Sequence, residues 1–387
     1  MPSLNEIIRQ EIHREGAIPF HRFMELALYC PELGYYERCR IGREGDFYTS
    51  VSTGTLFGAL LAHQFTRWLE AHPSGVVTIV EAGSHDGILA RDILKWLSLN
   101  RPDLFARLKY SILEPSSRRR AWQEQTLNEF AGQVGWFADW EALRSRRIVG
   151  VIFSNELLDA FPLRRFGWDA AARRWFEWGV RADENGLAWT RMPLTAAEWQ
   201  ATLTDTGIDL PPELCGILPD GYTVEVAPGA GQWWRQAAEA LESGHLVTFD
   251  YGFTGGDFIR PERLHGTLRA YHHHSLVANP LAEPGEADLT AHVNFTQLQR
   301  AGEAAGLRTE RLESQAAFLT RIVRDTMIAT STTWTPSERR QFQALTHPDH
   351  LGRAFQVLVQ SRAVPTPVIA PEARAGARPP PSSAPPR

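Results

Sequence analysis

The sequence contains little cysteine and no long apolar run. Its three cysteines form no CxxC pair and are too few and too scattered for a disulfide framework: Cys30, Cys39 and Cys215. No stretch reaches the roughly eighteen consecutive apolar residues of a membrane-spanning helix. The first sixteen residues mix acids with bases and lack an apolar core, so they predict an amphipathic helix rather than a signal or transit peptide. Together these absences predict a cytoplasmic protein with no membrane insertion.

The chain also lacks a strong excess of charge of either sign. Its 40 Lys and Arg residues and 45 Asp and Glu residues give a formal net charge of -5, which provides no general attraction to nucleic acid. A hydrophobic fraction of 43% and a charged fraction of 22% are those of an ordinary globular protein. The length of 387 residues suffices for one large domain carrying an insertion.

Strands and helices alternate from residue 76 onward, which is typical of a doubly wound α/β domain. Mostly apolar runs predict strands at residues 76–82, 109–114, 134–138, 148–154, 245–252, 306–312 and 355–361. Helices are expected at residues 88–98, 116–130, 228–244 and 295–305. We therefore predict one α/β domain over residues 76–363, with its ligand site at the carboxyl edge of the sheet.

Other segments depart from this alternation. Residues 1–75 predict helices at about 4–12, 20–28 and 56–70 around a glycine- and tyrosine-rich loop at 31–55, which we expect to be functional. At about residues 163–192 the periodicity becomes two, which predicts an inserted antiparallel β meander. A long polar stretch at about 253–294 is expected to be a substrate-loop region. Residues 364–387 are rich in Pro, Ala and Arg and are expected to be a disordered tail.

The first predicted strand of the α/β domain ends in a glycine-containing turn. Glu81, Gly83 and Gly87 fit the pattern E-x-G-x-G-x-G, whereas His85 takes the place of its middle glycine. Glycines allow the backbone to turn sharply and a ligand to approach it closely. Alone this motif is weak, because a tight packing point between a strand and a helix has the same residues.

An acid, Glu114, ends the second predicted strand. A carboxylate at that point accepts hydrogen bonds from the ribose hydroxyls of a nucleoside cofactor, although a solvated carboxylate is the alternative. A nicotinamide dinucleotide would use the same acid, but Asp86 lies where its pyrophosphate would bind. Because a zwitterionic amino-acid cofactor tolerates that charge, S-adenosylmethionine is favoured.

The strongest single signal follows the fourth predicted strand. Asn155, Glu156 and Asp159 come directly after the apolar run, and Pro162 then enforces an exit from the strand. A helix cap explains Asn155 or Asp159 alone but explains Glu156 poorly. We expect these side chains to point into the crevice at the edge of the sheet.

These motifs resemble those of the MidA family of S-adenosylmethionine-dependent methyltransferases. The resemblance runs from about residue 18 to residue 363 and rests on ALYCPELGYYERCRIGREGDFYTS, VEAGSHDGILARDIL, YSILEPSSRRRAWQEQ, FSNELLDAFPLRRF, FDYG and GTLRAYHHHSLVANPLAEPGEADLTAHVNF. It implies a class I methyltransferase-like mixed sheet. Mitochondrial members of the family dimethylate an arginine of a respiratory complex I subunit, which implies a protein substrate.

The resemblance also implies site residues. The cofactor would be held by Glu81, Gly83, Gly87, Glu114 and Asn155, with a loop containing Asp46, Thr49 and Ser50 folded over it. Asn155, Glu156 and Asp159 would face the methyl acceptor. One departure is that Ser84-His85-Asp86 replaces a more glycine-rich first turn. The oligomeric state stays open, a homodimer included.

An arginine acceptor needs a carboxylate in the site. Its guanidinium stays protonated in water, with a pKa above about 12, so an acid must orient it and localise its charge. Glu156 is the first candidate for this role and Asp159 the second, and the amide of Asn155 would hold the cofactor or the acceptor. Two alternatives remain: an inactive assembly scaffold of the same fold, with its cofactor site eroded at His85, and a nicotinamide-dependent oxidoreductase.

Histidine and tryptophan clusters complete the pattern. His272, His273, His274 and His292 do not predict a metal site, because consecutive strand residues point to opposite faces and no Cys or carboxylate lies nearby at zinc-site spacing. The rings of the predicted meander either form a docking surface or cover one face of the sheet: Trp168, Trp175, Trp178 and Trp189.

Overall fold

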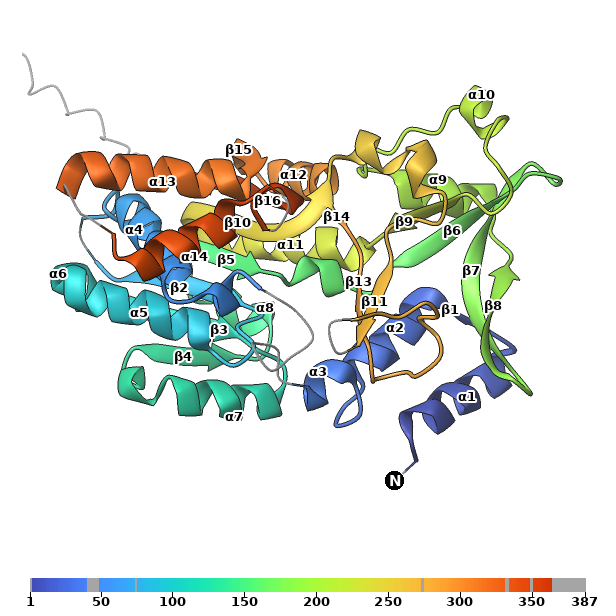
Figure 1. The fold of residues 1–387 in the computed structure, drawn as a ribbon, viewed down its shortest axis with the longest axis horizontal. Helices are drawn as coiled ribbons and strands as arrows, with labels where there is room; N and C mark the ends of the chain where they lie inside the picture. The colour runs from blue at the N-terminus through green and yellow to red at the C-terminus, as the bar shows by residue number, and fades with distance from the viewer. Residues whose placement is uncertain are drawn as a thin grey trace, which may run out of the picture.

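The computed structural model describes residues 2–39, 49–73, 75–272, 275–330, 334–348 and 351–363. An α/β lobe and a smaller, largely β lobe lie side by side (Figure 1). Asp46, His273 and His274 lie outside the described residues, as does the tail that we expect to be disordered.

A mixed sheet forms the centre of the α/β lobe, in the order β15-β16-β10-β5-β2-β3-β4, with β14 paired to β10. Five of these strands run parallel along the pairings β10-β5-β2-β3-β4, whereas β16 is antiparallel to both of its neighbours. This confirms the doubly wound mixed sheet. The strands are β2 (Val77–Ala82), β3 (Leu108–Leu113), β4 (Val134–Phe137), β5 (Ile148–Asn155), β10 (Leu241–Phe253), β14 (Val293–Asn294), β15 (Arg308–Ser314) and β16 (Phe355–Arg362).

Helices cover both faces of this sheet because its strands are apolar on both sides. Within β5, Val151 and Phe153 enter one core, and Ile152 enters the other. The first core also contains residues of α4 (Leu56–Leu69), α5 (Ile88–Asn100), α6 (Pro102–Phe105), α13 (Gln315–Thr330), α14 (Pro336–Thr346) and α15 (Leu351–Ala354). The second contains residues of α8 (Trp140–Arg144), α11 (Pro228–Ala240) and α12 (Phe295–Ala304). The helix α7 (Ser117–Thr126), followed by the turn η2 (Asn128–Phe130), connects β3 to β4.

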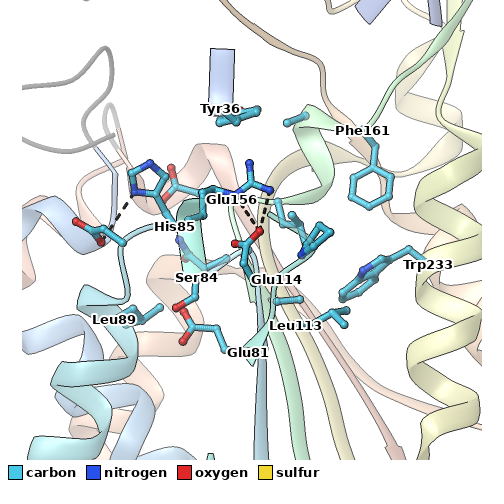
Figure 2. A pocket seen from close by; sticks show the side chains of 18 of the residues that line it. Tyr36, Glu81, Ser84, His85, Leu89, Leu113, Glu114, Glu156, Phe161 and Trp233 are labelled. Atoms are coloured by element: carbon cyan, nitrogen blue, oxygen red, sulfur yellow. Dashed lines mark hydrogen bonds and ion pairs between the residues drawn. The ribbon is translucent and has the colours of Figure 1, made fainter. Parts of the chain in front are cut away.

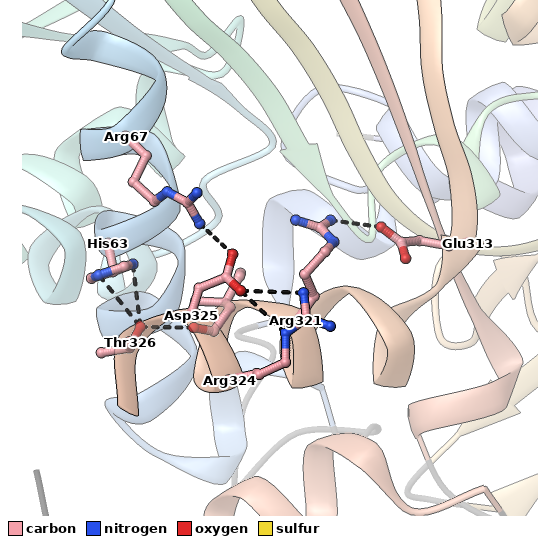
Figure 3. A network of polar contacts seen from close by, with 8 residues as sticks. His63, Arg67, Glu313, Arg321, Arg324, Asp325 and Thr326 are labelled. Carbon is pink, nitrogen blue, oxygen red and sulfur yellow. Dashed lines mark hydrogen bonds and ion pairs between the residues drawn. The ribbon is translucent and has the colours of Figure 1, made fainter. Parts of the chain in front are cut away.

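Polar contacts at the surface hold α13 on α4 (Figure 3). Arg67 of α4 donates to Asp325 of α13 at 2.6 Å, and the hydroxyl of Thr326 lies 3.4 Å from the His63 ring nitrogens. On the same helix Arg321 pairs with Glu313 of β15 at 2.6 Å. Because exposed ion pairs contribute little each, the apolar core beneath them provides most of the packing energy.

The smaller lobe contains the antiparallel strands β6 (Arg164–Asp169), β7 (Arg174–Asp183) and β8 (Gly186–Met192), in the region where the meander is predicted. Two strands that the sequence pattern does not reveal complete this sheet: β9 (Thr223–Val226) pairs with β6, and β1 (Ile18–Pro19) pairs with β7. The helices α9 (Ala196–Leu203) and α10 (Pro212–Cys215) pack on it.

Tryptophan rings fill the interior of this lobe. Trp168 and Trp175 are buried, and Trp175 stacks on Trp199 with ring centroids 4.5 Å apart. Trp189 packs on Phe20 at 4.9 Å, and the indole of Trp178 donates to Thr223. The rings therefore pack within the lobe on both faces of the sheet, Trp168 and Trp175 on one and Trp178 and Trp189 on the other, and not on a single face as in the second of the two interpretations.

The structure distributes residues 1–75 over two cores, although we predicted one N-terminal segment. The helices α1 (Leu4–Glu15), α2 (Phe20–Tyr29) and α3 (Tyr35–Arg38) share a core with the smaller lobe, whereas α4 packs on the large sheet. Between them the turn η1 (Val51–Thr53) leads into α4. Sequence periodicity marks the helices but not the partner that each helix packs against.

The polar stretch at about 253–294, which we predicted to be a substrate-loop region, contains regular secondary structure. It contains the turns η4 (Gly255–Phe258) and η5 (Pro261–Arg263) and a three-stranded sheet of β11 (Arg269–His272), β12 (Ser275–Leu276) and β13 (Asp288–Thr290). The carboxylate of Glu225 in β9 anchors this sheet by accepting bonds from the amide and hydroxyl of Thr267. These strands are too short to give a period-two signal.

Two glycines allow neighbouring central strands to approach closely, Gly150 between β5 and β2 and Gly244 between β10 and β5. A Cβ added to Gly150, which has φ +147°, would lie 2.1 Å from the Thr78 carbonyl oxygen, and one added to Gly244 would lie 1.9 Å from that of Gly150. We predict that Gly150→Ala lowers the free energy of unfolding by at least about 2 kcal/mol, because the clash is with backbone. Chemical denaturation measures this change.

Gly132→Ala is the matched control, since nothing lies within 4 Å of a Cβ built there. If the two variants were equally stable, the close approach at Gly150 would not be a constraint on the fold.

Candidate active site

A cavity of about 880 Å³ opens at the carboxyl ends of β2, β3, β4 and β5. Figure 2 shows His85 on one side and Phe161 and Trp233 on the other, with Glu114 and Glu156 between them. The volume lies within the range of small-molecule sites. The predicted residues that line it are Thr49, Glu81, Gly83, Glu114, Asn155 and Glu156.

The turn after β2 has three residues in the left-handed region. Gly83 has φ +73°, His85 has φ +46° and Gly87 has φ +83°. His85 thus adopts the backbone that the glycine of the pattern would adopt, at a cost of about 1 kcal/mol. Its side chain lines the cavity without filling it.

An acid precedes the helix that begins at this turn. Asp86 lines the cavity, and its Oδ1 accepts a hydrogen bond from the Ile88 amide at 3.2 Å. A phosphate bound at a helix N-terminus needs such amides as donors and is repelled by a carboxylate. The first turn of α5 is therefore poorly suited to a pyrophosphate.

The carboxylate of Glu114 is fixed by neighbours from α7. Its Oε1 accepts from the Ser116 amide and from Arg119 Nε, each at 2.9 Å, and its Oε2 accepts from Gln123 Nε2 at 2.9 Å. The same Gln123 amide also donates to the His85 carbonyl at 3.0 Å. A carboxylate has about four acceptor positions, so these three bonds orient Glu114 and leave acceptor capacity for a ligand.

Glu81, in β2, lies beneath the turn. It is buried, and its Oε2 accepts from the Tyr110 hydroxyl at 2.6 Å. Burial raises the pKa of Glu81 to about 7, against the opposing effect of the Tyr110 bond. Near neutral pH this group therefore exchanges between its acid and its carboxylate form.

Glu156 begins the turn that follows β5 and has φ +50°, a conformation that L side chains rarely adopt. Its Oε1 accepts from the Ser50 amide at 3.1 Å and from Asn155 Nδ2 at 3.0 Å. Burial raises the pKa of Glu156 to about 8, and Asp250 and Asp288 add to this effect, whereas the two hydrogen bonds oppose it. Strained residues of this kind cluster at functional sites.

The end of β10 holds this turn in place. The Glu156 amide donates to the Phe249 carbonyl at 2.9 Å, and Oδ2 of Asp250 accepts from the amides of Leu158 at 2.8 Å and Leu157 at 3.3 Å. Asp250 is fully buried, and burial raises its pKa to about 7. Among the described residues no ion pair joins Glu156 or Asp250 to a basic side chain.

Three predicted residues lie beside the cavity rather than on it. Gly87 and Ser50 are not among the residues that line it, although the chain neighbours of both are. Asp159, in η3 (Leu158–Ala160), faces a separate small pocket with Glu225 and His292. Asp159 is thus not among the residues that line the cavity with Glu156, and its role toward the acceptor stays a prediction.

The sequence reasoning missed several residues that line the cavity. Asp139 and Trp140 follow β4, Trp233 and Gln236 come from α11, and Arg119 comes from α7. An acid directly after the third strand of the domain was a usable signal for Asp139, since Glu114 ends the second strand in the same way. The contributions of α7 and α11 depend on tertiary packing and left no local signal.

The cavity fits a nucleoside with an amino-acid end better than a dinucleotide. The Glu114 carboxylate suits ribose hydroxyls, and Oδ1 of Asn155 is buried and accepts no hydrogen bond from the residues that the structure describes. A ligand ammonium group satisfies such an acceptor. The aromatic and aliphatic walls suit an adenine ring.

The match to a known family is consistent with this geometry. Residues 60–312 match the family model described as "Putative S-adenosyl-L-methionine-dependent methyltransferase". The chain belongs to this family. A crystal structure from Burkholderia thailandensis with bound S-adenosyl-homocysteine has the same fold, with a TM-score of 0.78 and 30% identity over 93% of this chain and 92% of that chain. The family resemblance and the cofactor S-adenosyl-L-methionine are thereby confirmed.

Curated relatives are also similar over most of their length. A Drosophila melanogaster protein named "Protein arginine methyltransferase NDUFAF7 homolog, mitochondrial" is 28% identical over 92% of this chain and 84% of its own. Its Bos taurus counterpart is 26% identical over 92% of this chain and 82% of its own.

These names contradict the cytoplasmic location that we predicted, since both relatives are named as mitochondrial. The prediction rested on composition, on cysteine content and on an N-terminal segment that does not resemble a transit peptide. Composition and cysteine content do not distinguish one reducing aqueous compartment from another. Within the described residues no helix is both long and apolar enough to cross a membrane.

The two described histidines of the predicted cluster, His272 and His292, have structural partners. His292 stacks on Phe253 with ring centroids 4.4 Å apart, and burial lowers its pKa to about 4. His272 Nδ1 lies 2.6 Å from the Glu286 carbonyl oxygen. No group of three or more potential metal ligands gathers in the described part of the chain.

The raised pKa of Glu156 predicts that stability falls as pH rises. A carboxyl whose folded pKa is raised keeps a proton that the unfolded chain has lost, so its stabilising effect disappears as pH rises through the folded value. We expect the Tm of the ligand-free protein to decrease between pH 7.5 and 9, where unfolded-state histidines are already neutral. Thermal unfolding at several pH values measures the slope.

Glu156→Gln should flatten that slope, whereas Glu184→Gln, in the exposed turn between β7 and β8, should leave it unchanged. An equal slope in all three proteins would contradict the assignment to Glu156.

Proposed function

We propose that this protein transfers a methyl group from S-adenosyl-L-methionine to an arginine side chain of a partner protein. The proposal rests on one observation: a strained turn presents the Glu156 carboxyl to the cavity, without a basic partner among the described residues. A carboxyl held in this way is suited to receive a cationic acceptor. The names of the curated relatives, which are protein arginine methyltransferases, support the same acceptor.

We assign the cofactor to the side of the cavity formed by β2 and β3. Glu114 would accept hydrogen bonds from the ribose hydroxyls, Gly83 would allow close approach at the turn, and Asn155 Oδ1 would accept from the ammonium group of the methionine end. Glu81 lies beneath this end, and Thr49 and Ser50 belong to the loop beside it. S-adenosyl-L-methionine supplies an electrophilic methyl group on a sulfonium.

Glu156 would orient the guanidinium of the acceptor. One proton is released overall when a methyl replaces a hydrogen on a guanidinium that stays cationic, so an ionised carboxylate is required near the acceptor nitrogen. Alignment of the reactants provides much of the catalysis in an in-line displacement. Asp159, one turn away, would influence the acceptor through its electrostatic interaction with Glu156 and Asp250 and would not contact the acceptor itself.

The identity of the acceptor protein is a separate part of the proposal. The family resemblance suggests a subunit of respiratory complex I, and this stays a prediction. Mass spectrometry of arginine methylation in cells with and without this gene identifies the acceptor directly.

Glu156→Gln should reduce kcat for methyl transfer on the order of 10²-fold, because it removes the only charge that we assign to the guanidinium. The rate of the wild-type protein should rise as pH increases through about 8, since Glu156 must be ionised. The rate of the variant should not show this increase with pH. Transfer of labelled methyl from the cofactor to arginine, measured after hydrolysis of the protein, tests this. Wild-type turnover by the variant would remove Glu156 from the mechanism.

Glu114→Gln should weaken cofactor binding more than it slows transfer. Loss of a hydrogen bond to a charged group costs about 1.5–3 kcal/mol, so the Kd for S-adenosyl-homocysteine should rise roughly ten-fold or more. Isothermal titration measures this value. Glu124→Gln on the exposed face of α7, where Glu124 pairs with Arg120, is the matched control. Equal affinity in both variants would place the ribose elsewhere.

A further inference from the structure

The loop beside the cavity is attached to the C-terminal helices as well as to the turn after β5. The Ser50 hydroxyl donates to Oε1 of Gln315, the first residue of α13, at 3.2 Å. At the other end of the loop, the Leu56 amide donates to Oε1 of Gln341 in α14 at 3.0 Å. Both helices lie beyond residue 312, where the match to the family model ends.

Gln315 connects three parts of the molecule from a fully buried position. Its amide Nε2 donates to the Leu345 carbonyl of α14 at 3.1 Å, while its oxygen faces the Ser50 hydroxyl. Gln315 and Ser50 are both 0% exposed. Removing one partner of a buried hydrogen bond leaves the other unsatisfied, so this contact fixes the place of Ser50 firmly.

Gln341 occupies the space next to a glycine of the loop. Gly54 has φ +134°, and a Cβ added to it would lie 2.5 Å from the Gln341 side chain. The side chain therefore packs against the loop backbone in addition to accepting the Leu56 amide. Two separate observations place Gln341 in this role.

The internal bonds of the loop fix its shape but not its place. The Ser52 amide donates to the Thr49 hydroxyl and the Thr49 amide to the Ser52 hydroxyl, which closes a local turn. Such a turn keeps its form wherever the loop lies. Among the described residues, the side chains of Gln315 and Gln341, together with the bond from the Ser50 amide to Glu156, locate the loop relative to the cavity.

The position of this loop matters to the site in two ways. Its residues Thr49, Val51, Ser52 and Gly54 line the cavity. Its Ser50 amide donates to Oε1 of Glu156 at 3.1 Å. A displacement of the loop would therefore change both the shape of the cavity and the environment of Glu156.

We propose that Gln315 and Gln341 are positioning residues that hold the 49–56 loop against the cofactor cavity and Glu156. Through them the helix pair α13–α14 is part of the active site although neither helix lines the cavity. The part of this inference that concerns Glu156 rests on the proposed function. The part that concerns the shape of the cofactor cavity does not.

The test uses Gln315→Leu and Gln341→Leu, which keep the side-chain volume but remove the acceptors. The Kd for S-adenosyl-homocysteine, measured by isothermal titration, should rise about five-fold or more in each. Methyl transfer to arginine in total protein from cells that lack this gene should fall about ten-fold or more, since small displacements at a site are costly. The pH of half-maximal rate should rise, because the Ser50 bond that lowers the pKa of Glu156 is weakened.

Gln343→Leu is the matched control, since Gln343 lies on the exposed face of the same helix. Its Kd and rate should stay within about two-fold of wild type. The double variant Ser50→Ala with Gln315→Leu should have the same Kd and rate as Gln315→Leu alone, because the two substitutions remove the same hydrogen bond. All assays are run below the Tm of each variant.

The proposal would be overturned if Gln315→Leu and Gln341→Leu had a lower Tm but kept the wild-type Kd, rate and pH profile. If the wild-type protein binds S-adenosyl-homocysteine but methylates no arginine, the proposed function fails while the Kd values still decide the role of the two glutamines.

Discussion

The site depends on one buried acid at the end of β10. Asp250 accepts the amides of Leu157 and Leu158, and the neighbouring Phe249 carbonyl accepts that of Glu156, so the chain is held in a left-handed turn as it leaves β5. A buried carboxylate without a basic partner is costly, and burial raises the pKa of Asp250 to about 7. The turn and the acid stabilise each other, because the amides that the turn exposes are the donors that the acid needs.

This arrangement gives the two halves of the cavity different chemistry. On the cofactor side, Glu114 is paired with Arg119 and oriented by Gln123. On the side that we propose for the acceptor, an amide and an Asn side chain are the donors to Glu156 among the described residues, and its pKa is raised to about 8. The two carboxyls therefore have different surroundings: Glu114 is held by a guanidinium and an amide and suits neutral hydroxyls, whereas Glu156, whose pKa is raised by burial, suits an incoming cation.

The two lobes and the C-terminal helices meet at this cavity. The large sheet provides Glu81, Glu114 and Glu156, and the N-terminal helices, which belong to the core of the smaller lobe, provide Tyr29 and Tyr36. The helices α13 and α14 hold the loop that contains Ser50. A site built from segments this far apart in the chain responds to packing at a distance from the chemistry.

Local pattern was enough to predict the strands of the large sheet, the helices between them, and the acids and glycines that end the strands. These signals survive in sequence because periodicity and strand ends are local properties: Gly83, Glu114 and Glu156 each follow an apolar run directly. Tertiary structure alone decided which of them meet. It placed Asp159 on a separate small pocket, added Arg119 and Trp233 to the cavity from neighbouring helices, and placed Gln315 against Ser50 across 265 positions of sequence. Such contacts depend on how elements pack, and no pattern within one element records them.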